Sequence, residues 1–83
     1  MDYSVYILYS KFLEKYYTGH TSMQVEERLS RHLSNHGGFT SKTRDWKIIH
    51  TEVFTNEKES LKKEKSIKKQ GAERYLRRIG KFS

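Results

Sequence analysis

A strict two-residue alternation at the start of the chain constrains the fold more than any other feature of the sequence. The side chains of Asp2–Tyr9 form two alternating sets, with Tyr3, Val5, Ile7 and Tyr9 on one face and Ser4, Tyr6 and Leu8 on the other. Aromatic and β-branched residues with this period are typical of a strand. A second short aromatic run, Lys15–His20, follows after the loop-length segment Ser10–Glu14. The chain therefore begins with a predicted antiparallel hairpin.

An amphipathic helix is predicted next. Its apolar residues recur with helical spacing and are Val25, Leu29 and Leu33. Thr21 and Ser22 are the candidate N-caps, and we expect the helix to stop at Gly37–Gly38.

Three further segments complete the predicted fold. They are a strand over Trp46–Phe54, a helix over Glu57–Gln70 capped by Thr55 or Asn56, and a short helix over Ala72–Ile79 after a break at Gly71. The expected order is ββαβα(α), with a small three-stranded antiparallel sheet flanked by helices. This is an α/β fold in the wider sense, of the α+β kind. Because the chain has 83 residues, we expect a single domain over residues 1–83.

Positive charge is concentrated in the C-terminal part. The chain has a formal net charge of +7, and residues 57–81 hold ten of its 17 basic and four of its 10 acidic residues. A basic segment of this kind predicts nucleic acid as the partner. The lysines expected at the phosphates are Lys42, Lys65, Lys68 and Lys69. A solvated helix face is the alternative, and a membrane surface is disfavoured because the segment lacks a broad apolar face with Trp or Phe.

The sequence also excludes several kinds of site. It has no cysteine, which excludes disulfides, thiolate metal sites and a cysteine nucleophile. It has no Gly-rich phosphate loop, so we expect no nucleotide cofactor. His32 and His36 have metal-ligand spacing, but they lack a third partner nearby. Because no apolar run is long enough for a signal peptide or a membrane span, we expect a cytoplasmic protein.

Glu64 is the most informative single residue. On a helix it shares a face with the two large apolar residues Leu61 and Ile67, so we expect all three to face the core. A carboxylate at the edge of a core is costly unless it is paired or binds a cation. Besides a bound cation, the open alternatives are an ion pair with Lys68 or Lys63 and a hydrogen bond to a buried tyrosine.

Arg28 and His32 form a second constellation. They are four residues apart and therefore lie on one side of the predicted first helix, beside its apolar stripe. An arginine held at the boundary between core and solvent is suited to clamp a phosphate. The alternatives are a surface arginine paired with Glu26 or Glu27 and a His32 at the core edge. We interpret His36 and His50 as structural.

Tyr6 and Tyr17 form a third constellation. Each faces away from its neighbours in its own strand, so the two can share one face if the strands pair. A phenol is a weak base with a pKa of about 10. Cationic neighbours would lower that pKa and let the phenol orient or deprotonate a water molecule. Sheet packing is the alternative role.

Together these segments resemble the GIY-YIG nuclease family across most of the chain. The segments concerned are Val5-Tyr6-Ile7, Tyr17-Thr18-Gly19, the helix Glu27–His32, the strand Trp46–Phe54 and the helix Ser60–Lys68. Ten residues separate Tyr6 from Tyr17, which is the spacing of the family. The likeness is to the small single-domain members and, more distantly, to the nuclease domain of the bacterial excision-repair endonuclease.

The resemblance implies roles for four residues in phosphodiester hydrolysis. Glu64 would be the single protein ligand of one Mg²⁺ or Mn²⁺ ion, a cation that takes oxygen ligands and keeps several waters. Arg28 would bind the scissile phosphate and stabilise its growing charge. Tyr17 or Tyr6 would position or deprotonate the attacking water.

It also implies roles for three residues around them. Gly19 would let the backbone approach the site. His20 stands where several relatives carry lysine, and its imidazole could shuttle a proton. His32 would hydrogen-bond to a phosphate or a water.

The leading interpretation is a metal-dependent DNA endonuclease, directed by the shape of its substrate and used in DNA repair or processing. DNA is favoured over RNA, and a protein partner could supply targeting. The first alternative is a nucleic-acid-binding module of the same fold with weak or no catalysis. The second is an accessory protein that meets its partner through an exposed apolar patch of Tyr75, Leu76, Ile79 and Phe82.

Overall fold

The secondary-structure elements follow the predicted order, ββαβαα. The computed structural model describes residues 2–34 and 43–80, without the side chains of His32 and Ser34. The elements are β1 (Tyr3–Ser10), β2 (Lys15–Thr21), α1 (Val25–Ser34), β3 (Lys47–Phe54), α2 (Glu57–Gln70) and α3 (Ala72–Arg78). The predicted α+β class and the antiparallel three-stranded sheet are confirmed.

The central strand of the sheet is β1, since the strand order is β2-β1-β3. The register places Tyr6 opposite Gly19 of β2 and opposite Thr51 of β3. Between β1 and β3 the register shifts at Ile7/Leu8, where Ile49 is the additional residue of a β-bulge. Alternate residues of β1 therefore face opposite sides of the sheet, as predicted.

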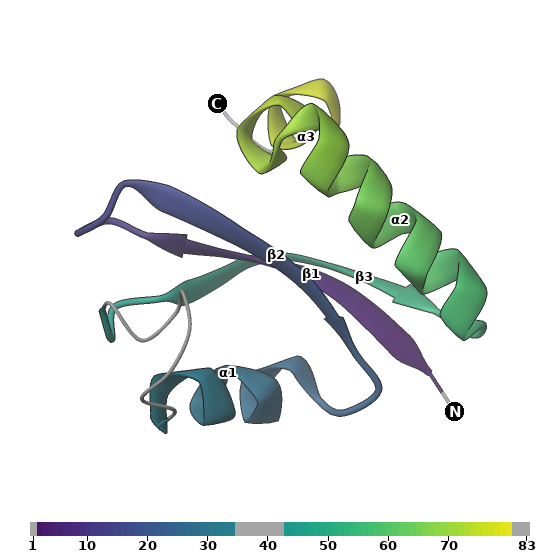
Figure 1. The fold of residues 1–83 in the computed structure, drawn as a ribbon, viewed down its shortest axis with the longest axis horizontal. Helices are drawn as coiled ribbons and strands as arrows, with labels where there is room; N and C mark the ends of the chain where they lie inside the picture. Colours follow the sequence, from purple (N-terminus) through teal and green to yellow (C-terminus); the bar gives the residue numbers. More distant parts are fainter. Residues whose placement is uncertain (1, 35–42, 81–83) are drawn as a thin grey trace.

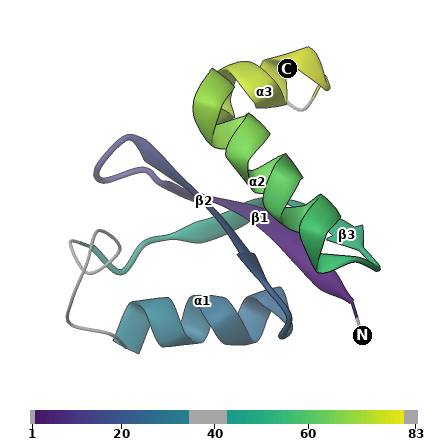
Figure 2. The same ribbon diagram turned by 45° about the vertical axis from the view of Figure 1, so that its right-hand side comes forward.

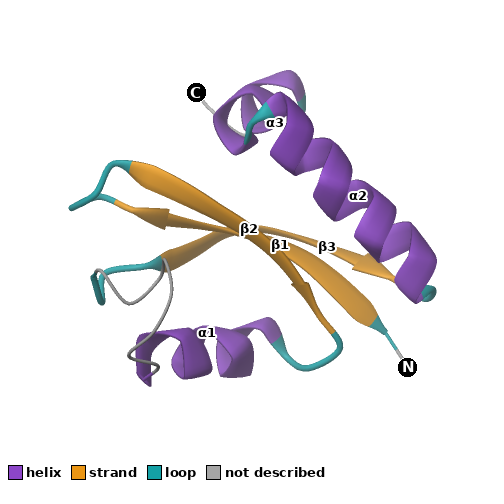
Figure 3. Ribbon diagram, viewed as in Figure 1, coloured by secondary structure: helices purple, strands orange, loops and turns teal. Residues whose placement is uncertain are grey.

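Helices cover both faces of the sheet. Helix α1 lies against one face, and α2 and α3 lie against the other (Figures 1 and 2), which gives the three layers seen in Figure 3. The buried residues form two clusters, Tyr6, Leu8, Val25 and Trp46 on the α1 side and Val5, Ile7, Ile67, Ala72, Tyr75 and Leu76 on the other. Within residues 2–34 and 43–80, none of the helices combines the length and the apolar character that crossing a membrane requires.

Helix α1 begins later than its predicted caps. Thr21 is the last residue of β2, and its Oγ1 accepts a hydrogen bond from the Met23 N–H at 3.1 Å. This bond forms the turn that links the strand to the helix, and the first turn of the helix forms when the Arg28 N–H donates to the Gln24 carbonyl. The prediction that Thr21 or Ser22 caps the helix is therefore wrong. The predicted stop at Gly37–Gly38 lies outside the described residues.

Helix α2 has the predicted bounds, and Asn56 is its N-cap. The Asn56 Oδ1 accepts hydrogen bonds from the backbone N–H groups of Lys58 and Glu59, at 2.8 and 3.4 Å. This side chain satisfies two of the N–H groups that a helix start leaves without a partner. Of the two predicted caps, the structure therefore selects Asn56.

The predicted apolar stripe of α2 is wrong at one position. Leu61 is 36% exposed, whereas Ser60 and Ile67 are fully buried. The hydroxyl of Ser60 donates a hydrogen bond to the Glu57 carbonyl at 2.7 Å, so the buried O–H has a partner. The helix packs closely along the line from Ser60 to Ile67, and Leu61, about 100° further round the axis, turns away from the sheet.

Helix α3 packs into the core. Tyr75 and Leu76 are buried there, and Ile79 at the end of the helix is exposed. Phe82 lies outside the described residues. Tyr75 and Leu76 are therefore not available to the exposed apolar patch that an accessory protein would need.

One carboxylate joins the β1–β2 hairpin to the segment before β3. Asp45 accepts a hydrogen bond from the Ser10 hydroxyl at 2.6 Å and another from the Phe12 N–H at 2.9 Å. Ser10 in turn accepts from the Leu13 N–H at 3.1 Å. These bonds, the one from Ser10 first, hold the pKa of the Asp45 carboxyl below its usual value. The hairpin loop is thus held by a residue 33 positions away from Phe12.

The burial of α2 gives a first prediction. Ile67→Ala should lower the free energy of unfolding by about 2–5 kcal/mol, because it removes a fully buried side chain and leaves a cavity. Leu61→Ala on the same helix is the matched control and should cost less than about 1 kcal/mol. Urea unfolding followed by circular dichroism measures both. Equal losses in the two variants would mean that the helix is rotated relative to this packing.

Candidate active site

The predicted site residues lie on both faces of the sheet and approach one another at β2. The register of β1 and β2 puts Tyr6, Tyr17 and Gly19 on the face that α1 covers. The same register puts His20, opposite Val5, on the face that α2 covers. The sheet ends at β2, because this strand has β1 on one side only. The two groups of residues are therefore separated only by the edge strand, at Gly19 and His20.

Gly19 is required by the position of Tyr6. A Cβ atom on Gly19 would lie 2.6 Å from the Tyr6 hydroxyl and 3.2 Å from the Tyr17 ring. The two rings are 6.4 Å apart between centroids, so the prediction that they share one face is confirmed. The rings of Tyr17 and Trp46 pack edge to face, with their centroids 6.5 Å apart. Gly19 lies inside β2 and does not end it, and its role is to admit the phenol to the sheet edge.

Arg28 reaches this cluster from α1. Its guanidinium donates a hydrogen bond to the Tyr6 hydroxyl, and its Nε is buried without a hydrogen-bond partner among the described residues. An N–H that is buried and unpaired is costly, so an acceptor brought by a ligand would be stabilised here. The geometry favours the phosphate-clamp interpretation of Arg28 over a surface ion pair.

The expected lowering of the tyrosine pKa is not found at Tyr6. Burial of the phenol raises its pKa above the usual value, and the hydrogen bond from Arg28 lowers the pKa by less than burial raises it. The nearby Tyr17 and the Glu64 carboxylate raise the pKa further. Tyr6 keeps its proton at neutral pH and can therefore donate a hydrogen bond.

Glu64 lies at the edge of the core as predicted, with 13% of its side chain exposed. Its Oε1 is 2.7 Å from the His20 Nδ1, and its Oε2 is 2.9 Å from the Lys68 Nζ. An ionised carboxylate only accepts hydrogen bonds, so the Nδ1 of His20 carries the hydrogen. The predicted pair with Lys68 is confirmed, and Lys63 pairs with Glu52 instead, at 3.8 Å.

The donor set around Glu64 fits one hard cation. Mg²⁺ and Mn²⁺ take oxygen ligands, and Mg²⁺ keeps several waters, so one carboxylate is a sufficient protein ligand. Each carboxylate oxygen has a second lone pair beyond the one facing His20 or Lys68. Lys68 is about half exposed and can move aside. Within the described residues, no three His, Asp or Glu side chains gather around one point.

The predicted nucleic-acid lysines have different surroundings. Lys65 and Lys69 are exposed on α2. Lys68, on the same helix, is held by Glu64. Lys42 and the side chain of His32 lie outside the described residues, as does His36.

Sequence reasoning missed a polar cluster on β3. His50 and Glu52 are joined by a hydrogen bond of 2.8 Å, and Tyr75 and Lys63 bind Glu52 from α3 and α2. The signal that could have revealed the cluster is the alternation of β3, because His50 and Glu52 are two residues apart on the face that also carries Phe54. Two polar residues on a face that packs against helices require partners.

The close approach at Gly19 gives a second prediction. Gly19→Ala should lower the free energy of unfolding by about 1–3 kcal/mol, because the new Cβ overlaps the Tyr6 phenol. Tyr6→Phe in the same chain should recover part of this loss, since it removes the nearest atom. A double-mutant cycle in urea measures the coupling. Additive losses would show that the ring does not lie over Gly19.

The comparisons with known proteins agree with this geometry. Residues 2–76 match the model of the GIY-YIG catalytic domain. A search of curated proteins gave no match. Among solved structures, the chain is similar to the solution NMR structure of the UPF0213 protein BH0048 from Bacillus halodurans, with 26% identity, a TM-score of 0.57, and coverage of 95% of this chain and 83% of that chain. Because the family model spans most of its length, the chain belongs to the GIY-YIG family of nucleases.

Proposed function

We propose that this protein is a metal-dependent endonuclease that hydrolyses phosphodiester bonds in DNA. The observation that carries the proposal is the meeting of an arginine donor, a phenol and a carboxylate across the sheet edge at Gly19. The Tyr6 hydroxyl lies over Gly19 and beside Arg28 on one face of the sheet, and Glu64 binds His20, the chain neighbour of Gly19, on the other. A phosphate binder beside a carboxylate that can hold a cation is the arrangement that phosphodiester hydrolysis needs.

Arg28 binds the phosphate in this proposal. Its unpaired buried Nε–H is available to a phosphate oxygen, while its hydrogen bond to Tyr6 fixes the guanidinium. Tyr6 is only 1% exposed, so its role is to hold Arg28. Tyr17 is more exposed and lies against Tyr6, so we assign it the orientation of the attacking water, a step worth about 10²–10⁴-fold.

Glu64 holds the metal ion, and His20 orients Glu64 through its Nδ1–H. When bound, the ion would neutralise charge on the phosphate and help the leaving oxygen depart. Lys68 neutralises the carboxylate when no ion is bound. His20 stays bound to Oε1, where it limits the rotation of the carboxylate.

The exposed lysines of α2 support nucleic acid as the substrate. Lys65 and Lys69 lie next to the stripe that carries Glu64 and Lys68 along the helix. Contacts from lysine to phosphate position a duplex but carry no sequence information. We therefore propose a DNA substrate recognised by its shape, such as a branch, a flap or a nick, in repair or processing.

One observation favours a binding module of the same fold as the second candidate. An unpaired inward carboxylate would repel a phosphate, but Lys68 at 2.9 Å offsets the charge of Glu64. A chain in this state can bind a phosphate without any ion. Cleavage assays separate the two candidates.

The role of Glu64 gives a third prediction. Glu64→Gln should abolish cleavage in Mg²⁺ or Mn²⁺ while binding to DNA survives, because the neutral amide is a poor cation ligand and removes no phosphate contact. The measurement is cleavage of labelled branched, nicked, single-stranded and duplex DNAs, with each ion and with EDTA. Glu59→Gln, on the exposed side of the same helix, is the control and should cut like the wild type.

Two outcomes would contradict this assignment. Full metal-dependent activity of Glu64→Gln would remove the residue from the site. No cleavage by the wild type on any of the DNAs, with salt-sensitive binding intact, would support the binding module.

The lysines give a fourth prediction. Lys65→Ala and Lys69→Ala should each weaken DNA binding and reduce the slope of log K against log salt by about 1, the effect of losing one phosphate contact. Lys68→Ala should weaken binding more strongly in EDTA, since it leaves the Glu64 carboxylate unneutralised. Fluorescence anisotropy over a salt series measures all three. Unchanged slopes for Lys65→Ala and Lys69→Ala would place the DNA on another face.

A further inference from the structure

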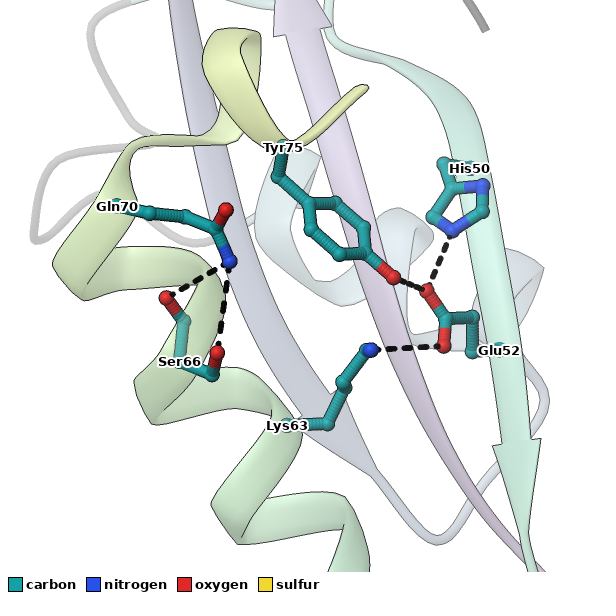
Figure 4. A network of polar contacts seen from close by, with 6 residues as sticks. All are labelled: His50, Glu52, Lys63, Ser66, Gln70 and Tyr75. Carbon is teal, nitrogen blue, oxygen red and sulfur yellow. Dashed lines mark hydrogen bonds and ion pairs between the residues drawn. The ribbon is translucent and has the colours of Figure 1, made fainter. Parts of the chain in front are cut away.

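A polar network on β3 lies outside the site described above. Figure 4 shows its centre, where the side chains of His50, Lys63 and Tyr75 all point at Glu52. Each comes from a different element, since His50 and Glu52 lie on β3, Lys63 on α2 and Tyr75 on α3. The network therefore joins an edge strand of the sheet to both of the helices that cover this face.

The two oxygens of Glu52 have different partners. Oε2 accepts from the Tyr75 hydroxyl and from the His50 Nε2–H. Oε1 faces the Lys63 Nζ at 3.8 Å. Burial alone would raise the pKa of Glu52, but the hydrogen bonds from Tyr75 and His50 and the charge of Lys63 together lower it below the usual value. Glu52 is therefore ionised at neutral pH, and its charge holds Lys63.

Lys63 is held from a second direction as well. Its ammonium lies 4.9 Å from the centre of the Tyr75 ring, within the distance of a cation–π interaction. A lysine on a helix surface normally moves among many rotamers. Here the partners of Lys63 fix its position relative to β3.

Lys63 is the chain neighbour of Glu64, and the two lie on opposite sides of the buried line of α2. Consecutive helix residues are about 100° apart around the axis, and the buried Ser60–Ile67 line runs between these two. On one side Lys63 is tied to β3 through Glu52, and on the other side Glu64 is tied to β2 through His20. The helix is thus held to both edge strands of the sheet at two adjacent residues.

We propose that Glu52 is a positioning residue for Glu64, acting through Lys63 by fixing the rotation of α2 about its axis. The inference rests on the proposed function in taking Glu64 as the metal ligand. Side-chain tips lie about 5–6 Å from a helix axis, so a rotation of about 10° moves such a tip by about 1 Å. A displacement of this size at a catalytic group can cost roughly 100-fold in rate.

One substitution removes only the ion pair between Glu52 and Lys63 of α2. In Glu52→Gln the amide oxygen can still accept from Tyr75 and His50, while the amide NH₂ replaces the oxygen that faces Lys63. Lys63→Met is the reciprocal variant, because it keeps most of the aliphatic side chain and removes the charge. Both changes leave the residues of the proposed active site in place.

The first readout needs neither metal nor cleavage. Nitrogen chemical shifts of the His20 ring, recorded well above the usual histidine pKa of about 6.5, report which nitrogen carries the hydrogen. The wild type should hold it on Nδ1, facing Glu64. Glu52→Gln and Lys63→Met should each lower the Nδ1–H fraction, and the double variant should do no more than either change alone.

The second readout is Mn²⁺ binding to the protein without DNA. Both single variants should bind Mn²⁺ about 10-fold more weakly, the effect expected when support of a metal ligand is lost. Ile67→Val is the control, because it destabilises the same helix by about 0.5–1.5 kcal/mol without touching Glu52 or Lys63. It should leave both readouts at their wild-type values.

Each outcome decides the proposal. A wild-type Nδ1–H fraction in folded Glu52→Gln and Lys63→Met would overturn it, as would an equal change in Ile67→Val. If Glu52→Gln does not fold, Lys63→Met carries the test alone. If the variants change the His20 tautomer but the wild type binds no Mn²⁺, the result would support the positioning role of Glu52 and count against the proposed metal site. Failure of the positioning role and failure of the metal site can therefore be distinguished.

Discussion

The burial of β1 on both faces is the constraint on which the rest of the structure depends. Val5, Tyr6, Ile7 and Leu8 are at most 1% exposed, so each face of this one strand needs a helical layer. In a chain of 83 residues the two layers share a three-stranded sheet, and the hydrogen-bonding edges of that sheet stay close to its centre. A phenol on the central strand can therefore reach the sheet edge, which is where the candidate site residues of the two faces approach one another.

Much of this architecture follows from local patterns in the sequence. The two-residue alternation of β1 specifies which residues share a face, and the pairing of the hairpin then brings Tyr6 and Tyr17 together. The bounds of α2 follow from Asn56 at one end and Gly71 at the other, both of which are local backbone signals. The resemblance to the GIY-YIG family rests on the same local segments, which is why the family could be identified before the fold was known.

The parts that could not be predicted depend on contacts between distant segments. The buried line of α2 contains Ser60 in place of Leu61, because close approach to the sheet favours the smaller side chain there. The pKa of Tyr6 is raised because burial outweighs Arg28, and burial is a property of the whole fold. The contacts of Glu64 with His20 and of Glu52 with Tyr75 likewise join different elements, at separations that no periodicity in the sequence encodes.

Asp45 has a consequence for how the fold assembles. Its carboxylate, just before β3, accepts hydrogen bonds from Ser10 and Phe12 of the hairpin, so the hairpin lacks these bonds until the third strand has docked. The hairpin by itself also exposes both faces of β1, and isolated two-stranded hairpins are at best marginally stable in water. Local formation of the first two strands therefore gains little by itself. The sheet acquires its stability only when the chain's two halves meet, which makes folding a single cooperative event.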